Sequence, residues 1–246
     1  FALEGYKVAF TGRDQEKMQQ VVHEMREMDG HSLAIIGDVA NEADCRRSVE
    51  ETINHFGRLD VVICNAGISM RAMFTDTDLN VLKKLMDVNF WGTVYTVKYA
   101  LPFIIQSKGS VVGISSIAGY RGLPGRTGYS ASKFAMQGFL ESLRTEMIPH
   151  QVHVLVACPG FTSSNIRNVA LTADGSPQGD SPREEDKMMT AEEVAGYIIS
   201  AVKKRKRDII LTTQGKVTVW LNRLLPGLAD KLVFNHMAKE DNSPLK

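Results

Sequence analysis

The chain repeatedly alternates short apolar runs with stretches of helical periodicity. Six runs rich in Val, Ile, Leu and Ala have the length of strands, and most are nearly continuous, as in parallel strands covered on both faces. We expect strands at Lys7–Gly12, Leu33–Val39, Val61–Ala66, Ser110–Ser115, His153–Ala157 and Asp208–Thr212. Repeated strand–helix–strand units imply right-handed crossovers with helices on both faces of a parallel sheet. The predicted fold is a single doubly wound α/β domain over residues 1–246.

The segments between these strands carry the 3.6-residue periodicity of amphipathic helices. Helices are expected at Asp14–Asp29, Glu42–Phe56, Leu79–Gln106, Gly128–Pro149 and Ala191–Lys204. The last of these opens with a capping box, because Thr190 is followed three residues later by Glu193.

The composition is ordinary for a globular protein, with 43% hydrophobic and 23% charged residues. A formal net charge of +1 gives no reason to expect nucleic acid or an anionic membrane as a partner. The 3 cysteines share no Cys-x-x-Cys spacing, so we expect reduced thiols, a cytoplasmic protein and no metal site. We also expect no signal peptide and no membrane-spanning helix, since no charge-free apolar run is long enough.

Tyr129 and Lys133 lie four positions apart, which places them on one face of a predicted helix. A neighbouring ammonium favours phenolate, so we expect the pKa of the Tyr129 phenol to fall from about 10 toward neutrality. Such a phenol can give a proton to a carbonyl or take one from an alcohol. Ser116, at the end of an apolar run, could hydrogen-bond the same oxygen. The alternative is an ordinary amphipathic helix with a surface lysine.

The Ser-Ser pair, the Gly/Pro-rich loop and the helix opening Tyr129-Ser-Ala-Ser-Lys133 resemble the short-chain dehydrogenase/reductase family. The pattern is most similar to the branch that includes hydroxysteroid dehydrogenases, and the resemblance spans nearly the whole chain. It implies a Rossmann-type fold and a catalytic triad of Ser116, Tyr129 and Lys133. It also implies that Asn89 distorts the long helix and holds a water leading to Lys133, with a buried structural amide as the alternative.

The resemblance further implies a nicotinamide dinucleotide cofactor. Arg13 follows the first strand, where an acidic residue would favour NAD(H), so we expect NADP(H), unless Arg13 is a solvated residue paired with Asp14. The family's other cofactor positions match Asp38, Val39, Asn65, Ala66, Gly67, Pro159, Gly160 and Thr162, together with Tyr129 and Lys133. The alternative for Asp38 is a plain strand-end cap.

The glycine-rich turn that holds the pyrophosphate in this family, Thr-Gly-x-x-x-Gly-x-Gly, does not occur in the sequence. The chain starts at Phe1, in a segment typical of a helix tail and a Gly stop, so we expect a first strand and this turn to have been lost through truncation or processing. Without that strand the parallel sheet would expose two unpaired edges near its centre, which favours truncation or processing. The alternative is a chain that has lost nucleotide binding.

Two later segments carry weaker signals. Residues 161–189 are rich in Gly, Ser, Pro and charges, so we expect a substrate-covering loop, with a disordered surface excursion as the alternative. Residues 217–240 suggest two amphipathic helices broken at Pro226, which would wall the substrate pocket or an oligomer interface, or lie on a membrane surface. The basic run Lys203–Arg207 is typical of a solvated helix end.

The sequence therefore predicts an NADP(H)-dependent oxidoreductase that interconverts a ketone or aldehyde and an alcohol, with Tyr129 as general acid/base. The substrate would be a small molecule, lipid-like or steroid-like. The family usually assembles as homodimers or homotetramers through the helices that carry Asn89 and Tyr129. The rivals are a non-catalytic relative without a nucleotide loop, and an epimerase or dehydratase on the same fold.

Overall fold

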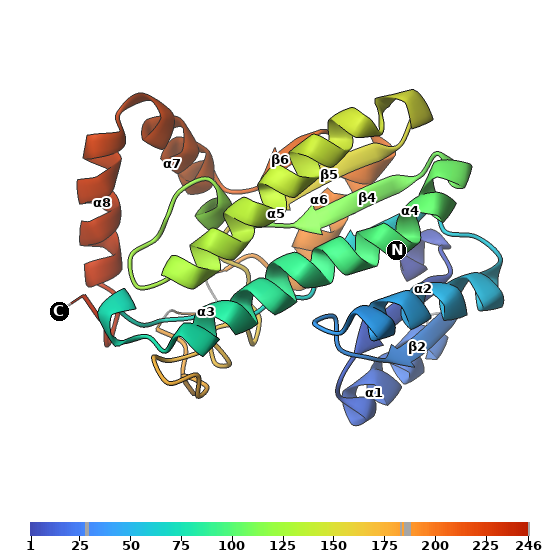
Figure 1. The fold of residues 1–246 in the computed structure, drawn as a ribbon, viewed down its shortest axis with the longest axis horizontal. Helices are drawn as coiled ribbons and strands as arrows, with labels where there is room; N and C mark the ends of the chain where they lie inside the picture. Colours follow the sequence, from blue (N-terminus) through green and yellow to red (C-terminus); the bar gives the residue numbers. More distant parts are fainter. Residues whose placement is uncertain (28–29, 183, 185–187, 246) are drawn as a thin grey trace.

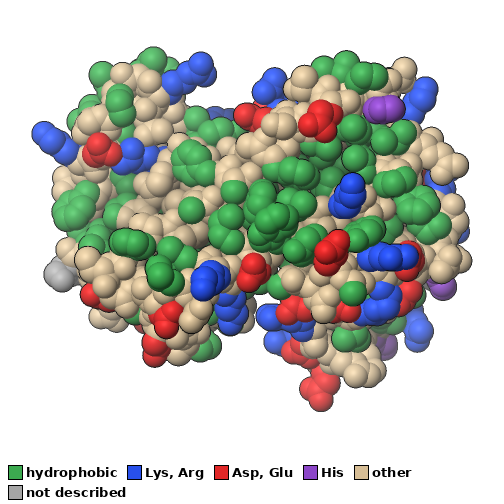
Figure 2. Space-filling model, in the orientation of Figure 1, with side chains coloured by type: hydrophobic (Ala, Val, Ile, Leu, Met, Phe, Trp, Pro, Cys, Tyr) green, Lys and Arg blue, Asp and Glu red, His purple; other side chains and the backbone are tan. Residues whose placement is uncertain are grey.

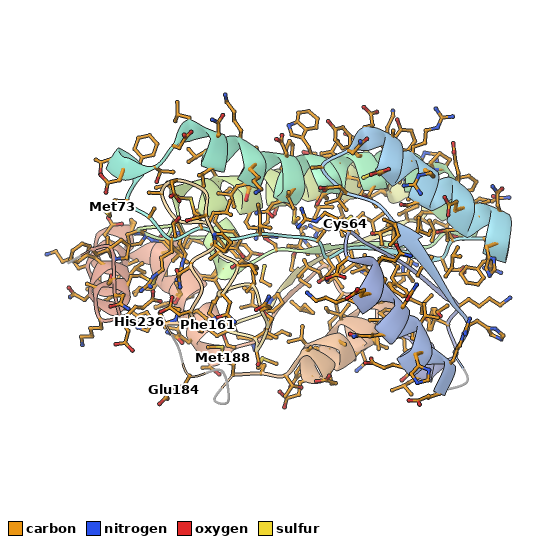
Figure 3. All side chains as sticks on the ribbon, turned by 90° about the horizontal axis from the view of Figure 1, so that it is seen from below. Cys64, Met73, Phe161, Glu184, Met188 and His236 are labelled. Carbon is orange, nitrogen blue, oxygen red and sulfur yellow. The ribbon has the colours of Figure 1, made fainter. Side chains whose placement is uncertain are left out.

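The structure is a computed structural model and describes residues 1–27, 30–182, 184 and 188–245. Its strands form a middle layer between two layers of helices (Figures 1 and 3). Three helices cover one face: α2 (Glu42–Phe56), α4 (Gly92–Ser107) and α5 (Thr127–Glu146). The other face is covered by α1 (Gln15–Glu27) and α6 (Ala191–Lys203). This is the α/β architecture that the alternating pattern predicts.

The strands of the described residues form two parallel sheets rather than one. In the first, β1 (Val8–Gly12) pairs with β2 (Ser32–Ile36). The second has the order β3–β4–β5–β6, with bounds Val61–Cys64, Ser110–Ile114, His153–Cys158 and Asp208–Ile210.

The central strands β4 and β5 are buried on both faces. Val111 and Val154 pack in the hydrophobic cluster that includes residues of α4 and α5, whereas Val112 and Leu155 pack against α6. Gly113 of β4 allows α5 to approach closely, because a Cβ there would lie 2.2 Å from Leu140 Cδ1. This packing explains why the two runs are continuously apolar, and it fixes the helix that carries Tyr129 against the sheet.

The unpaired edges of β1 and β3 border the same cavity, which separates the two sheets. On β1, the N–H of Val8 donates a hydrogen bond to the carbonyl of His31, beside β2. Because backbone groups alternate in direction along a strand, the N–H and C=O groups of Ala9 and Thr11 point away from β2 and into the gap.

The edge of β3 shows the same alternation. Asp60 accepts a hydrogen bond from Ser110 of β4, so the next residue, Val61, and then Ile63 direct their backbone groups away from β4. These two edges confirm the expectation that a parallel sheet without its central strand exposes two unpaired edges.

The long helix expected over residues 79–106 is confirmed, with a distortion near its middle. It begins as α3 (Leu79–Met86), passes through a π-helical turn, η3 (Asp87–Trp91), and continues as α4. Asn89 lies in that turn, so the distortion implied by the family resemblance is confirmed. A π-turn adds a residue to the helix and is frequent at functional sites.

The other boundaries differ by a few residues. The strand expected to reach Val39 ends at Ile36, and the helix expected to reach Pro149 ends at Glu146 before a short 3₁₀ turn. The capping box of Thr190 and Glu193 is confirmed. Asp29, the expected end of the first helix, lies outside the described residues.

The chain ends in two helices, α7 (Thr213–Leu224) and α8 (Pro226–Ala238), which meet at Pro226 as expected. They stand at one end of the molecule (Figure 1). In the loop 161–189, Ala170 and Leu171 are buried, and Leu171 forms a β-bridge with Met70. A disordered excursion is therefore wrong for this part of the loop, while residues 183 and 185–187 lie outside the described residues.

Candidate active site

The first turn of α5 brings Tyr129 and Lys133 together. The Lys133 Nζ lies 5.9 Å from the centre of the Tyr129 ring, as four-residue helical spacing predicts. Lys133 is only 3% exposed, and its ammonium donates a hydrogen bond to Ile114 O at 2.9 Å. The alternative of a surface lysine is therefore wrong.

Ser116 joins this pair from the end of β4. Its backbone is extended, its Oγ accepts a hydrogen bond from the Ala118 N–H at 3.2 Å, and its hydroxyl is hydrogen-bonded to the Tyr129 phenol. Ser116, Tyr129 and Lys133 all line the cavity that runs along the carboxyl ends of the strands. The structure thus assembles the predicted triad.

The electrostatics of the pair differ from the sequence expectation. Burial raises the pKa of the Tyr129 phenol above 10, although the hydrogen bond from Ser116 and the charge of Arg126 act in the opposite direction. Burial also lowers the pKa of the Lys133 ammonium to about 8. The expected lowering of the Tyr129 pKa by Lys133 is therefore wrong for this structure, because desolvation of the site favours both neutral forms. A protonated phenol near neutral pH is suited to donate a proton.

Asn89 supports the triad from behind. It is fully buried, and its side-chain amide accepts from Ile68 N at 2.8 Å and donates to Ile68 O and Ser132 Oγ at 2.9 Å. Gly67 lies between Asn89 and Lys133: a Cβ there would be 3.3 Å from Asn89 Oδ1 and 3.4 Å from Lys133 Nζ. Asn89 does not itself line the cavity, so the geometry gives it a supporting position.

The cavity has a volume of about 1660 Å³ and includes the gap between β1 and β3. Most of the predicted residues line it: Asp38, Val39, Asn65, Ala66, Gly67, Ser116, Tyr129, Lys133, Pro159, Gly160 and Thr162. The strand ends therefore converge on one elongated site, where parallel α/β sheets bind their ligands.

Arg13 lies at the far end of this site. Its guanidinium is 3.5 Å from the Asp38 carboxylate, and the Arg13 side chain is 66% exposed. The expected alternative partner, Asp14, instead pairs with Lys17. Arg13 does not line the cavity, but through Asp38 it stands beside it.

The donors present fit the two ends of a nicotinamide dinucleotide. The Lys133 ammonium and Tyr129 hydroxyl would meet the nicotinamide ribose, while Asp38, Val39 and Arg13 stand where an adenosine would lie. Between these ends the cavity opens into the gap between the sheets.

The opposite end of the cavity is closed by later parts of the chain. Phe161, from the loop that follows Pro159 and Gly160, and His236 of α8 both line it. Figure 3 shows these two residues on the side of the C-terminal helices, away from Cys64 at the end of β3. This end would receive the substrate.

Sequence reasoning missed several neighbours of the triad. The positive charge of Arg126, three residues before Tyr129, acts to lower the pKa of the Tyr129 phenol. The three-residue spacing, within one helical turn, could have indicated this interaction. Gln137 donates to Ser115 Oγ at 2.9 Å beneath the site, and no local pattern marks that long-range contact.

Three further expectations concern groups outside the triad. Cys45, Cys64 and Cys158 are free and buried. Within the part of the chain that the structure describes, His, Cys, Asp and Glu side chains nowhere gather in a group that could hold a metal ion. Among the same residues, every helix is too short or too polar to cross a membrane.

Comparisons with known proteins show the family of the chain. The family model described as short chain dehydrogenase matches residues 1–174. The mouse protein Dehydrogenase/reductase SDR family member 7B is 34% identical over 252 residues, which cover 99% of this chain and 77% of that protein. The 11-beta-hydroxysteroid dehydrogenase-like 2 of Arabidopsis thaliana is 38% identical over 168 residues, which cover 68% of this chain and 54% of that protein.

A solved structure shows the same fold. The short chain dehydrogenase/reductase from Burkholderia phymatum in complex with NAD matches with a TM-score of 0.80 at 20% identity, covering 90% of this chain and 85% of that chain. The family model covers most of the chain, and the mouse relative aligns with nearly all of it. The chain therefore belongs to the short-chain dehydrogenase/reductase family of oxidoreductases.

Proposed function

We propose that this chain interconverts a ketone or aldehyde and an alcohol, with Tyr129 as the acid/base residue and NADP(H) as cofactor. The observation that supports this most is the meeting of Ser116, Tyr129 and Lys133 at one wall of the cavity. A nicotinamide cofactor, when bound, supplies the hydride or accepts it.

The side chains of the chain itself would handle the proton. In the reductive direction, Ser116 donates a hydrogen bond to the carbonyl oxygen and orients it, and the Tyr129 hydroxyl gives that oxygen its proton. Lys133, protonated below about pH 8, would stabilise the phenolate that remains and contact the cofactor ribose. Asn89 would hold the segments of Ile68 and Ser132 beside Lys133 in place. It would also support a water that passes a proton back toward Lys133 and Tyr129.

The role of Tyr129 is tested by Tyr129→Phe. We expect carbonyl reduction to fall by about 10²–10⁴-fold or more, because the variant keeps the ring but has no proton to donate. Unfolding in urea should be nearly unchanged. The control is Tyr197→Phe, which removes the hydroxyl of an exposed tyrosine on α6. Full turnover in Tyr129→Phe would refute the assignment.

The preference for NADP(H) rests on Arg13, whose exposed guanidinium could bind a 2′-phosphate bidentately. Arg13→Gln should weaken NADPH binding by about 10- to 100-fold, since a charge-assisted hydrogen bond contributes about 1.5–3 kcal/mol. NADH binding should change little. Fluorescence titration with both cofactors measures this, with Arg46→Gln as an exposed-arginine control. An equal loss for both cofactors would argue for NAD(H) or for no preference.

The substrate end supports a lipid-like or steroid-like molecule. Apolar side chains of α7 and α8 line it, among them Val217, Leu221, Leu232 and Val233. The names of the Arabidopsis relatives refer to hydroxysteroid dehydrogenase activity. A panel of steroid and aliphatic ketones offered with NADPH tests this class.

Assembly as a homodimer or homotetramer is part of the same proposal. Hydrophobic side chains gather along the middle of the face shown in Figure 2, over α4 and α5. Trp91 and Phe134 are exposed on this side of the sheet, at 42% and 45%. Light scattering measures the mass in solution, and a monomer would contradict this part.

The rival to this proposal is a non-catalytic binding protein of the same fold. A protein of this second kind would bind steroid-like ligands but neither NADPH nor NADH, so the cofactor titration separates the two.

A further inference from the structure

A buried charge cluster lies beside the active site, outside the triad. The Glu240 carboxylate is 3.2 Å from the Arg126 guanidinium and 3.5 Å from that of Arg71. The side chains of Glu240, Arg71 and Arg126 are 5%, 7% and 12% exposed. Buried charges at this spacing interact far more strongly than surface pairs.

The cluster ties the end of the chain to the start of α5. Glu240 follows α8, and the adjoining Asp241 accepts a hydrogen bond from Arg71 through its carbonyl. Pro244 packs within 3.2 Å of the position that a Cβ of Gly125 would take. Figure 1 shows the end of the chain beside the segment that leads into α3. Residues 240–245 thus pack beside Arg71 and the segment that leads into α5.

Arg126 connects this cluster to the chemistry. It is the residue immediately before α5, and its carbonyl accepts the N–H of Ser130, so it sets the first turn that holds Tyr129. Arg126 and Arg71 also line the cavity. The positive charge of Arg126 counteracts the effect of burial on the Tyr129 phenol.

We propose that Glu240 is a positioning residue of the active site. Through Arg126 it anchors the first turn of α5 and holds a positive charge at a fixed place relative to the Tyr129 phenol. This inference rests on the proposed function, since it assigns Tyr129 the proton transfer. According to this proposal, the last residues of the chain help to position the residues of the active site.

The charged and titratable groups around Arg126 and Tyr129 come from several elements. Among the described residues they are Arg71 before α3, Lys133 of α5, Cys158 of β5 and Glu240 of the C-terminal segment, while His236 of α8 lines the same cavity. Glu240 bridges the two arginines, so its removal is expected to release Arg126 from its place.

The test is a double-variant cycle on alcohol oxidation, in which Tyr129 must accept a proton. In Arg126→Met the rise of kcat/KM with pH should move to higher pH, because the phenol loses a stabilising positive charge. Glu240→Ala should move it in the same direction and lower kcat by about 10-fold, as misplacement of a catalytic group does. The variant carrying both changes should match Arg126→Met alone, and Arg126→Lys should restore much of the wild-type profile.

Asp230→Asn is the matched control, because Asp230 of α8 pairs with Arg121, and neither residue lines the cavity. If Glu240→Ala does not fold, Glu240→Gln keeps the shape and should lower kcat by less than about 10-fold, because its amide oxygen can still accept a hydrogen bond from Arg126. Additive effects of the two changes, or a shift to lower pH, would overturn the proposal.

Amide hydrogen exchange separates this inference from the proposed function. Glu240→Ala should speed exchange at Ser130–Lys133, and Asp230→Asn should not, whether or not the protein turns over any alcohol. Unchanged exchange there overturns the positioning role. Absence of turnover in the wild-type protein would instead refute the proposed function.

Discussion

Tyr129 and Lys133 are held where desolvation favours the neutral form of each. Burial raises the pKa of the Tyr129 phenol above its ordinary value and lowers the pKa of the Lys133 ammonium to about 8. Lys133 is nevertheless hydrogen-bonded to Ile114 O, which fixes its direction. In a site of this kind the phenol carries a proton that it can donate. The protonation state of the lysine can change when a bound ligand alters the local electrostatic field.

The lowered pKa of Lys133 predicts how stability changes with pH. Below about pH 8 the folded protein buries a charged ammonium, whereas between about 8 and 10.5 the folded form is neutral and the unfolded form still charged. The burial penalty is therefore present below pH 8 and fades as pH rises. We expect the stability advantage of Lys133→Met over the wild type to shrink by about 3 kcal/mol between pH 7 and 10.5.

Urea unfolding of both proteins at several pH values measures this difference. Lys98→Met, which removes an exposed lysine of α4, is the control and should show no such trend. A difference between Lys133→Met and the wild type that stays constant with pH would contradict the burial of the charge.

At this scale the spacing of Tyr129 and Lys133 was readable from the sequence, because four residues return a helix to the same face. The burial of Lys133 was not readable, since it depends on how closely α5 packs on β4 at Gly113. The same holds for Glu240, which meets Arg71 from the other end of the chain. Long-range contacts of this kind produce no periodic pattern in the sequence.

At the scale of elements, specific backbone groups of the two sheets have no strand partner among the described residues. On β1, Ala9 and Thr11 face the gap, while Val8 and Phe10 face β2. We expect the amides of Ala9 and Thr11 to exchange at least about 10-fold faster than those of Val8 and Phe10, because exchange follows local hydrogen bonding. Val8 and Phe10 are an internal control within the same strand.

Hydrogen exchange followed by NMR resolves these four amides. Uniform protection along β1 would show that its outer edge is paired and would contradict the interrupted sheet. A strand supplied between β1 and β3 should protect Ala9 and Thr11 selectively.

Elements were predicted best where local chemistry marks their ends. Helix α6 begins at its capping box, and α8 begins at Pro226, as expected. Strand ends shifted more: a strand was expected over Val61–Ala66, but β3 ends at Cys64, immediately before Asn65. The distortion at Asn89 was implied by the family resemblance, but its form as a π-turn was not predicted.

At the scale of the whole molecule, one elongated cavity joins three regions. It runs from Asp38 beside β2, past the triad, to His236 of α8. The gap between the sheets opens onto its middle. The arrangement suits a ligand with two ends held apart, a dinucleotide, next to an apolar substrate.

The most direct test of this account is the transfer of deuterium from NADPH labelled at C4 of the nicotinamide. The wild-type protein should deliver the label to the carbinol carbon of the product alcohol, as detected by mass spectrometry. Tyr129→Phe should deliver almost none in the same time. An epimerase, a dehydratase or a binding protein would leave the label on the nicotinamide, and that result with the wild-type protein would contradict the proposed reaction.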